Sequence, residues 1–229
     1  MKNASAALFL FSIALFFSFI LILYYVPLCK ILNIMSGTPV LIYAESTPNP
    51  ATLKFVANVF LLPEKSAEYL KAEDAEGAPL VQALFEMPFV RAVYVCNNFV
   101  TITKKEFTSW TEIIPQVREF LKSWLTEGKD VIVMLPAKKE EKKPVEIADL
   151  NSEGIAAQII DALDEYVKPA VESDGGEISF VSFNNGVVTV RLQGSCSGCP
   201  SSTVTLKQGI ENLLKRMVPG VTEVIAENG

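Results

Sequence analysis

The sequence contains no histidine among its 229 residues, and this absence excludes more chemistry than any other feature. Without imidazole there is no Ser-His-Asp or Cys-His nucleophilic catalysis and no His-ligated zinc or haem. Metal chemistry must therefore use cysteine, aspartate or glutamate. A basic patch is missing as well, since 20 Lys and Arg stand against 26 acidic residues and the net charge is −6. We expect no nucleic-acid partner, because binding to phosphates needs clustered basic side chains.

Cysteine and arginine are also scarce. The four cysteines are Cys29, Cys96, Cys196 and Cys199, which are too few for a disulfide scaffold and fit a reducing compartment. No arginine precedes Arg91, which argues against a mitochondrial transit peptide, because such peptides are rich in arginine. We therefore expect a cytoplasmic protein.

Charged residues are absent from residues 4–26, a run of 23 positions. As a helix this run is roughly 34 Å long, enough to cross a hydrocarbon core of about 30 Å. Residues 1–34 are expected to be either an apolar transmembrane helix, with the rest of the chain facing the cytoplasm, or an untranslated extension before a start at Met35. A cleaved signal peptide is the third alternative, although no small-residue cleavage site follows the run.

Residues 40–135 have the pattern of a small α+β domain. The predicted elements are strands at 40–44 and 52–56, a helix at 79–87, a hairpin of 93–96 with 99–103, and a helix from about 109 to 127. The hairpin closes at Asn97-Asn98, because asparagine tolerates a positive φ.

Residues 136–150 hold few large apolar side chains and a run of Lys and Glu, so we expect a flexible linker with few contacts across it. Residues 151–229 form a second unit. Its predicted elements are a helix at about 152–168, which Pro169 ends or kinks, a hairpin of 178–183 with 187–193, and a helix at about 201–218. The fold class is therefore α+β: two small α+β domains joined by a charged linker, after an apolar N-terminal helix.

Cys196 and Cys199 lie in the loop 194–200 (Gly-Ser-Cys-Ser-Gly-Cys-Pro) between the hairpin and the last helix. This spacing brings two thiols close enough to bind one metal centre or cluster. The loop opens into a helix, so the second cysteine is expected to lie near free N–H groups and the positive end of the helix dipole, both of which lower the pKa of a thiol.

Four interpretations of this pair stay open on the residues alone. The cysteines can be structural, a thioredoxin-like redox pair, half of a zinc site or half of an iron–sulfur site. The last two sites need four ligands, so two chains must meet to complete one. Cys96 is expected to be a small buried strand residue and Cys29 lies beyond the apolar run, so neither is expected to help.

Three segments together resemble a known family. In order they are 172–178 (Glu-Ser-Asp-Gly-Gly-Glu-Ile), 194–202 (Gly-Ser-Cys-Ser-Gly-Cys-Pro-Ser-Ser) and 218–221 (Val-Pro-Gly-Val), and they resemble the C-terminal domain of NifU, the Nfu domain. Residues 42–130, beginning Ile-Tyr-Ala-Glu-Ser-Thr-Pro-Asn-Pro, are similar to the N-terminal domain that accompanies it in Nfu proteins.

The resemblance implies an iron–sulfur cluster scaffold or carrier rather than an enzyme. Such a protein binds a 4Fe–4S cluster between two subunits and passes it to apo iron–sulfur proteins. Cys196 and Cys199 match the family's ligand positions, so the expected partners are a second copy of the chain, bridged by the cluster, and the recipient proteins. The alternative is a thiol–disulfide oxidoreductase that uses the same two cysteines.

Overall fold

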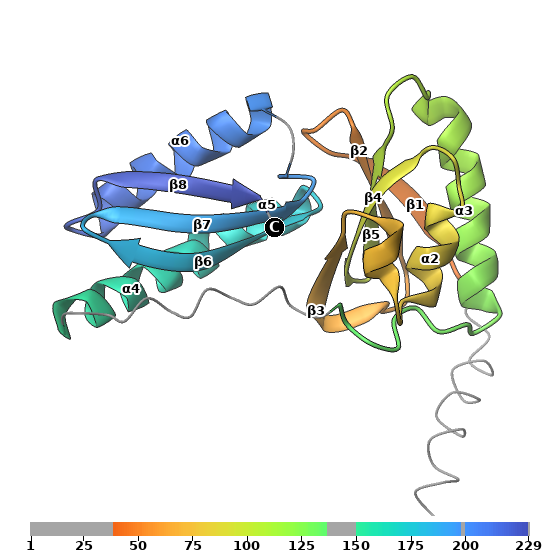
Figure 1. Cartoon of the computed structure of the whole chain (residues 1–229), viewed down its shortest axis with the longest axis horizontal. Coiled ribbons are helices and arrows are strands. Elements are labelled where there is room, and N and C mark those ends of the chain that lie inside the picture. Colours follow the sequence, from red (N-terminus) through yellow and green to blue (C-terminus); the bar gives the residue numbers. More distant parts are fainter. Residues whose placement is uncertain (1–38, 137–149, 198–199, 229) are drawn as a thin grey trace, which may run out of the picture.

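The computed structural model describes residues 39–136, 150–197 and 200–228, which form two α+β units side by side (Figure 1). The predicted apolar N-terminal helix and nearly all of the predicted linker lie outside these residues. Within the described ranges, no helix is both long enough and apolar enough to cross a membrane.

The N-terminal unit is an antiparallel five-stranded sheet with two α-helices. Its elements are β1 (Ile42–Ser46), β2 (Thr52–Ala57), β3 (Leu62–Tyr69), the 3-10 helix η1 (Ala72–Ala75), α2 (Pro79–Phe85), β4 (Val90–Asn97), β5 (Phe99–Lys104) and α3 (Trp110–Thr126). The strands are ordered β1-β2-β5-β4-β3. The predicted hairpin and both helices are confirmed, and Asn97 turns the hairpin with a φ of 43°.

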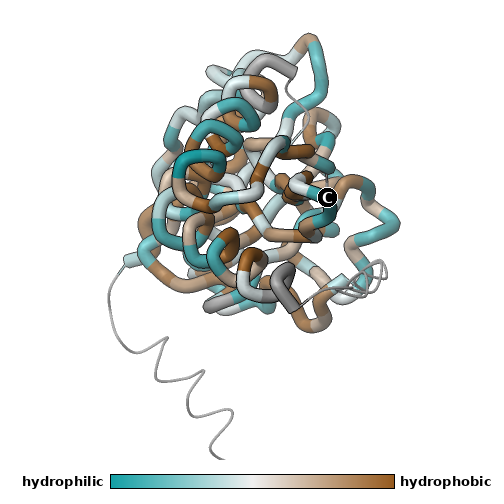
Figure 2. Tube along the Cα trace, turned by 90° about the vertical axis from the view of Figure 1, so that its left-hand side faces the viewer, coloured by the Kyte–Doolittle hydropathy of each residue, from teal (hydrophilic) through white to brown (hydrophobic). Residues whose placement is uncertain are grey.

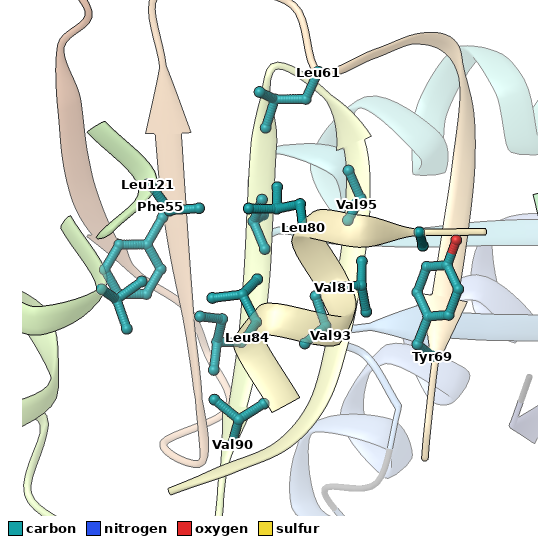
Figure 3. Packing of buried hydrophobic residues seen from close by; sticks show 14 of the residues in the cluster. Phe55, Leu61, Tyr69, Leu80, Val81, Leu84, Val90, Val93, Val95 and Leu121 are labelled. Carbon is teal, nitrogen blue, oxygen red and sulfur yellow. The ribbon is translucent and has the colours of Figure 1, made fainter. Parts of the chain in front are cut away.

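The core of this unit lies between the sheet and its helices. Leu80, Val81 and Leu84 of α2 are fully buried, and Figure 3 shows them beside Val93 and Val95 of β4. The α3 helix adds three inward residues at helical spacing: Ile113, Val117 and Leu121. Because side chains alternate between the faces of a strand, this packing covers only one face of the sheet.

The opposite face of the sheet is covered as well. All six residues of β2 are buried, so side chains on both of its faces are shielded from water. On the face away from the helices, Val56, Tyr94, Cys96 and Phe99 form a separate buried cluster. The second unit covers this face (Figure 1), through contacts described below.

The C-terminal unit is a three-stranded sheet with its own helices and core. Its elements are α4 (Leu150–Ala162), a π-helical turn η2 (Leu163–Val167), α5 (Lys168–Ser173), β6 (Gly176–Asn184), β7 (Val187–Gly194), α6 (Pro200–Met217) and β8 (Glu223–Asn228). The strand order is β6-β7-β8, with β7 antiparallel to β6 and parallel to β8. Val190 and Leu192 of β7 pack with Ile159, Ile210 and Leu214. In Figure 2, hydrophilic and hydrophobic residues alternate along the helical turns, as expected for helices with one buried face.

Pro169 interrupts the first helix of this unit without ending it. The chain passes from α4 through the π-helical turn into α5, where Pro169 lies in the first turn. A proline inside a helix lacks an N–H and crowds the carbonyl four residues before it, and the π-helical turn lies immediately before Pro169, where the N–H of Lys168 donates to the carbonyl of Leu163 instead. The helix therefore continues to the turn that precedes β6.

Candidate metal-binding loop

The predicted cysteine loop follows the end of β7 and leads into α6. Cys196 lies within the described residues, whereas Gly198 and Cys199 lie outside them. The pairing of the two cysteines at one site therefore stays a prediction. Among the residues that the structure describes, no group of three or more Cys, Asp, Glu or His is arranged to hold a metal ion.

Cys196 is packed against its own unit. Only 8% of the residue is exposed, and it belongs to the same buried cluster as Val190 and Leu192. A Cβ atom built on Gly176 would lie 2.8 Å from its Sγ atom, so the backbone of Gly176 runs directly beside the sulfur. Cys196 is therefore part of the packing of the C-terminal unit and not only of a surface loop.

Burial also sets the acidity of this thiol. Loss of solvation raises the pKa of Cys196, and the nearby carboxylate of Asp174 raises it further, while a hydrogen bond with Ser195 lowers it. The lowered pKa that the sequence predicts from the dipole of the following helix concerns Cys199, which lies outside the described residues. At Cys196, the cost of burying a thiolate outweighs the favourable hydrogen bond.

A turn that contains Gly175 is hydrogen-bonded to the start of the cysteine loop. The turn joins α5 to β6, and Gly175 adopts a φ of +81° that favours glycine. The N–H of Ser195 donates to the carbonyl of Gly175 at 3.2 Å, and its hydroxyl donates to the carbonyl of Asp174 at 2.6 Å. This turn therefore holds Ser195, the residue that precedes Cys196, in place.

A pocket of about 460 Å³ opens beside Cys196. It is lined by Pro48, Ala170, Val171, Asp174, Ser195, Cys196, Thr205 and Leu206. Seven of these residues belong to the C-terminal unit, but Pro48 comes from the N-terminal unit, just before β2. The two units therefore meet at this cysteine.

The N-terminal unit also holds the loop by hydrogen bonds. The side-chain amide of Asn49 donates to the carbonyls of Ser195, at 3.2 Å, and Ser197, at 3.4 Å. The carboxylate of Glu68 on β3 accepts from the N–H of Gly194 at 2.8 Å and from the hydroxyl of Ser197 at 3.2 Å. Burial raises the pKa of Glu68, although these hydrogen bonds favour its charged form.

The expectation of few contacts between the two units is therefore wrong. It relied on the composition of the linker, and a polar linker places no limit on how the units it joins pack together. Neither Asn49 nor Glu68 was predicted as a site residue. Asn49 lies between two predicted strands, in a segment for which no function was predicted, and β3 was not predicted at all. Cys96 is buried in β4, as predicted.

Comparison with known proteins matches both units. The family model described as "Scaffold protein Nfu/NifU N terminal" matches residues 42–128, and the one described as "NifU-like domain" matches residues 159–225. A protein from Drosophila persimilis named "NFU1 iron-sulfur cluster scaffold homolog, mitochondrial" is 35% identical over 199 residues, covering 85% of this chain and 68% of that protein. "NifU-like protein 4, mitochondrial" from Arabidopsis thaliana is 35% identical over 188 residues, covering 81% of this chain and 65% of that protein.

The chain thus spans about two thirds of the length of these relatives. Among solved structures, a NifU-like protein from Saccharomyces cerevisiae is 27% identical to this chain, with a TM-score of 0.39. The match covers 43% of this chain and 89% of that protein, so it extends over less than half of the fold described above. The two family models, the N-terminal one followed by the NifU-like domain, define a class of two-domain scaffold proteins for iron–sulfur clusters. Within that class, the chain belongs to the Nfu family.

The predicted location is corrected by the same comparison. The sequence predicted a cytoplasmic protein, with residues 4–26 as a membrane anchor in one of the alternatives, but the relatives are named as mitochondrial proteins. The hydropathy and the arginine content of a segment indicate how that segment interacts with a membrane or an import receptor. They do not determine the compartment in which the folded units work. The cytoplasmic prediction is wrong, because the relatives are named as mitochondrial proteins.

Proposed function

We propose that this protein is a carrier of 4Fe–4S clusters, which it binds through Cys196 and Cys199 and delivers to apo iron–sulfur proteins in the mitochondrion. The cluster is cargo rather than a resident cofactor. The observation that carries the proposal is the position of Cys196, at the wall of a pocket and in a loop braced by a glycine turn, in a chain of the Nfu family. The names of the relatives support the scaffold role.

The number of ligands fixes the proposed stoichiometry. A 4Fe–4S cluster is held by four thiolates, and each chain supplies two from this loop. Two chains therefore share one cluster, and each contributes Cys196 and Cys199. A shared site releases its cargo when the chains separate, which is the property that a carrier needs.

The chain's own residues prepare the loop for this task. Gly176 has no side chain, so its backbone fits directly beside Cys196, where a Cβ atom would lie only 2.8 Å from the sulfur. Gly194 adopts a φ of +67°, which lets β7 turn sharply into the loop. The bonds from Ser195 to Asp174 and Gly175 hold the start of the loop in place while the cysteines exchange their cargo.

The oxidoreductase alternative uses the same two cysteines. Both functions need the thiolate form, so the burial of Cys196 does not separate them. The colour of the protein does: an oxidoreductase would be colourless after anaerobic purification, whereas a protein that holds an iron–sulfur cluster would be brown.

The test is the iron and sulfide content of the full chain, together with its mass in solution. The protein is reconstituted anaerobically with ferrous iron, sulfide and dithiothreitol, then passed through a desalting column and a sedimentation-velocity run. We expect four irons and four sulfides per two chains, a monomer before loading and a dimer after it. A loaded monomer with a full cluster would show that external thiols complete the site. A protein that binds no iron would refute the carrier function.

A further inference from the structure

Four neighbouring strands of the N-terminal sheet present one row of side chains to the C-terminal unit. The strand registers pair Lys54 with Thr101, Thr101 with Tyr94, and Tyr94 with Glu68, so the row crosses β2, β5, β4 and β3. We call these four residues the docking row. They lie on the sheet face opposite to α2 and α3, and each of them reaches the other unit.

Every member of the docking row has a hydrogen-bond partner in the segments that support or form the cysteine loop. The ammonium of Lys54 donates to the carbonyls of Glu172 and Ser173, at 3.3 and 3.0 Å. The hydroxyl of Thr101 donates to the carbonyl of Gly175 at 2.8 Å, that of Tyr94 donates to the carboxylate of Glu177 at 3.2 Å, and Glu68 accepts from Gly194.

Apolar contact seals the same face. Val56, Cys96 and Phe99 lie in the adjacent row and are each at most 6% exposed. A Cβ atom on Gly194 would lie 2.9 Å from the ring of Tyr94, so the end of β7 is pressed against that ring. A row of polar groups with matched partners beside a row of buried apolar side chains is typical of a specific interface rather than of a chance contact.

We infer that the N-terminal domain is an intramolecular cover for the cysteine loop, and that it must leave the loop before a cluster can bridge two chains. This inference rests on the proposed function. Pro48 forms part of the pocket wall at Cys196, and Asn49 holds the carbonyls of the residues on either side of it. The loop of a second chain cannot occupy that place while the cover is docked. Loading is therefore coupled to undocking.

The experiment uses the full-length chain and introduces a bulky, charged side chain at the centre of the docking row. Thr101 is 1% exposed and lies on the face away from the helix-side core, so Thr101→Arg blocks docking while leaving that core in place. Thr101→Ser keeps the hydroxyl and is the matched control. A second pair, Glu68→Ala and Glu68→Gln, removes or keeps the oxygen that accepts from Gly194.

Two readouts separate docking from loading. Hydrogen exchange of the Gly194 amide reports docking without iron, because its partner Glu68 lies in the other unit. The Ser195 amide is the internal control, since its partner Gly175 lies in its own unit. The second readout is the rate at which ferrous iron and sulfide are incorporated.

We expect Thr101→Arg and Glu68→Ala to speed exchange at Gly194 about tenfold or more, the factor expected for loss of a hydrogen bond to a charged group. Cluster incorporation should accelerate in the same variants, with both controls close to the wild type. Unchanged exchange at Gly194 would overturn the docking, and faster exchange with unchanged incorporation would overturn its control over loading. If no variant incorporates iron, the proposed function and the gating fail together, while the exchange data still decide whether the cover docks.

Discussion

Replacement of a single cysteine separates the ligand role of Cys196 from its packing role. Cys196→Ser keeps the size of the side chain but replaces a buried, weakly polar sulfur by a hydroxyl. Burying a hydroxyl that lacks a full set of partners costs about 1–3 kcal/mol. We expect a loss of about 1–2 kcal/mol, because Ser195 offers a neighbouring hydroxyl that lies 3.8 Å from Sγ.

Cys96 provides the matched control. It is 6% exposed, compared with 8% for Cys196, and it also packs among apolar side chains. Cys96→Ser should therefore cost a similar amount of stability. If Cys196 is a ligand, only its replacement abolishes iron binding. The two variants should therefore lose similar stability, but Cys196→Ser should lose its iron and Cys96→Ser should keep it.

The assay combines urea unfolding, followed by circular dichroism, with iron and sulfide counts after anaerobic reconstitution. Both variants should unfold at a lower urea concentration than the wild type and should keep its spectrum in the absence of urea. The reasoning is refuted if Cys196→Ser keeps its full iron content. It is equally refuted if Cys96→Ser loses iron to the same extent, because the loss would then follow from destabilisation.

Three further predictions concern the architecture. The fragment 151–229 should fold alone and bind the cluster, because its core draws only on its own elements, and a random-coil circular dichroism spectrum under iron-replete conditions would contradict this. Gly186→Ala should lower the free energy of unfolding in urea by about 1–2 kcal/mol, because φ is +83° and the new Cβ would lie 2.6 Å from Thr222 Oγ1. Gly209→Ala should instead raise it by up to about 1 kcal/mol, because Gly209 lies in α6 and a Cβ atom there would have nothing within 4 Å. Leu121→Ala should cost about 2–5 kcal/mol in the N-terminal unit and leave the iron content unchanged, and a loss of iron would show that the cores are coupled.

The elements that the sequence predicted well are those with strong local patterns. The hairpins have alternating apolar residues around Asn-rich turns, and α3 repeats its apolar residues at helical spacing behind an N-cap at Ser109. The strand β3 was missed because Pro63, Lys65 and Glu68 disfavour a strand and it pairs only with a distant segment. The strand β8 was missed because Glu223, Glu227 and Asn228 disfavour a strand and its partner β7 lies before the intervening helix.

The candidate site was predictable only in its chemistry. The cysteine spacing and the glycines were visible in the sequence, but the burial of Cys196 depends on Gly176, Ile178 and the helices that pack beside them. The docking row was invisible for a different reason. A threonine, a tyrosine, a lysine and a glutamate on separate strands show no pattern along the chain, and only the pairing of β2, β5, β4 and β3 aligns them.

The parallel pairing of β7 with β8 holds both ends of the cysteine loop in place. The chain leaves the carboxyl end of β7, crosses through α6 and returns as β8 beside the strand it left, so the loop is the first bend of a β-α-β crossover. In open α/β sheets, ligands bind at this end of the strands. Both anchors of the loop are consequently rigid: β7 is held between two neighbours, and α6 is fixed to β8 by the N–H of Val224, which donates to Glu211 at 3.1 Å. Such a loop can take up and release an inorganic cargo while the strand and the helix on either side of it keep their fold.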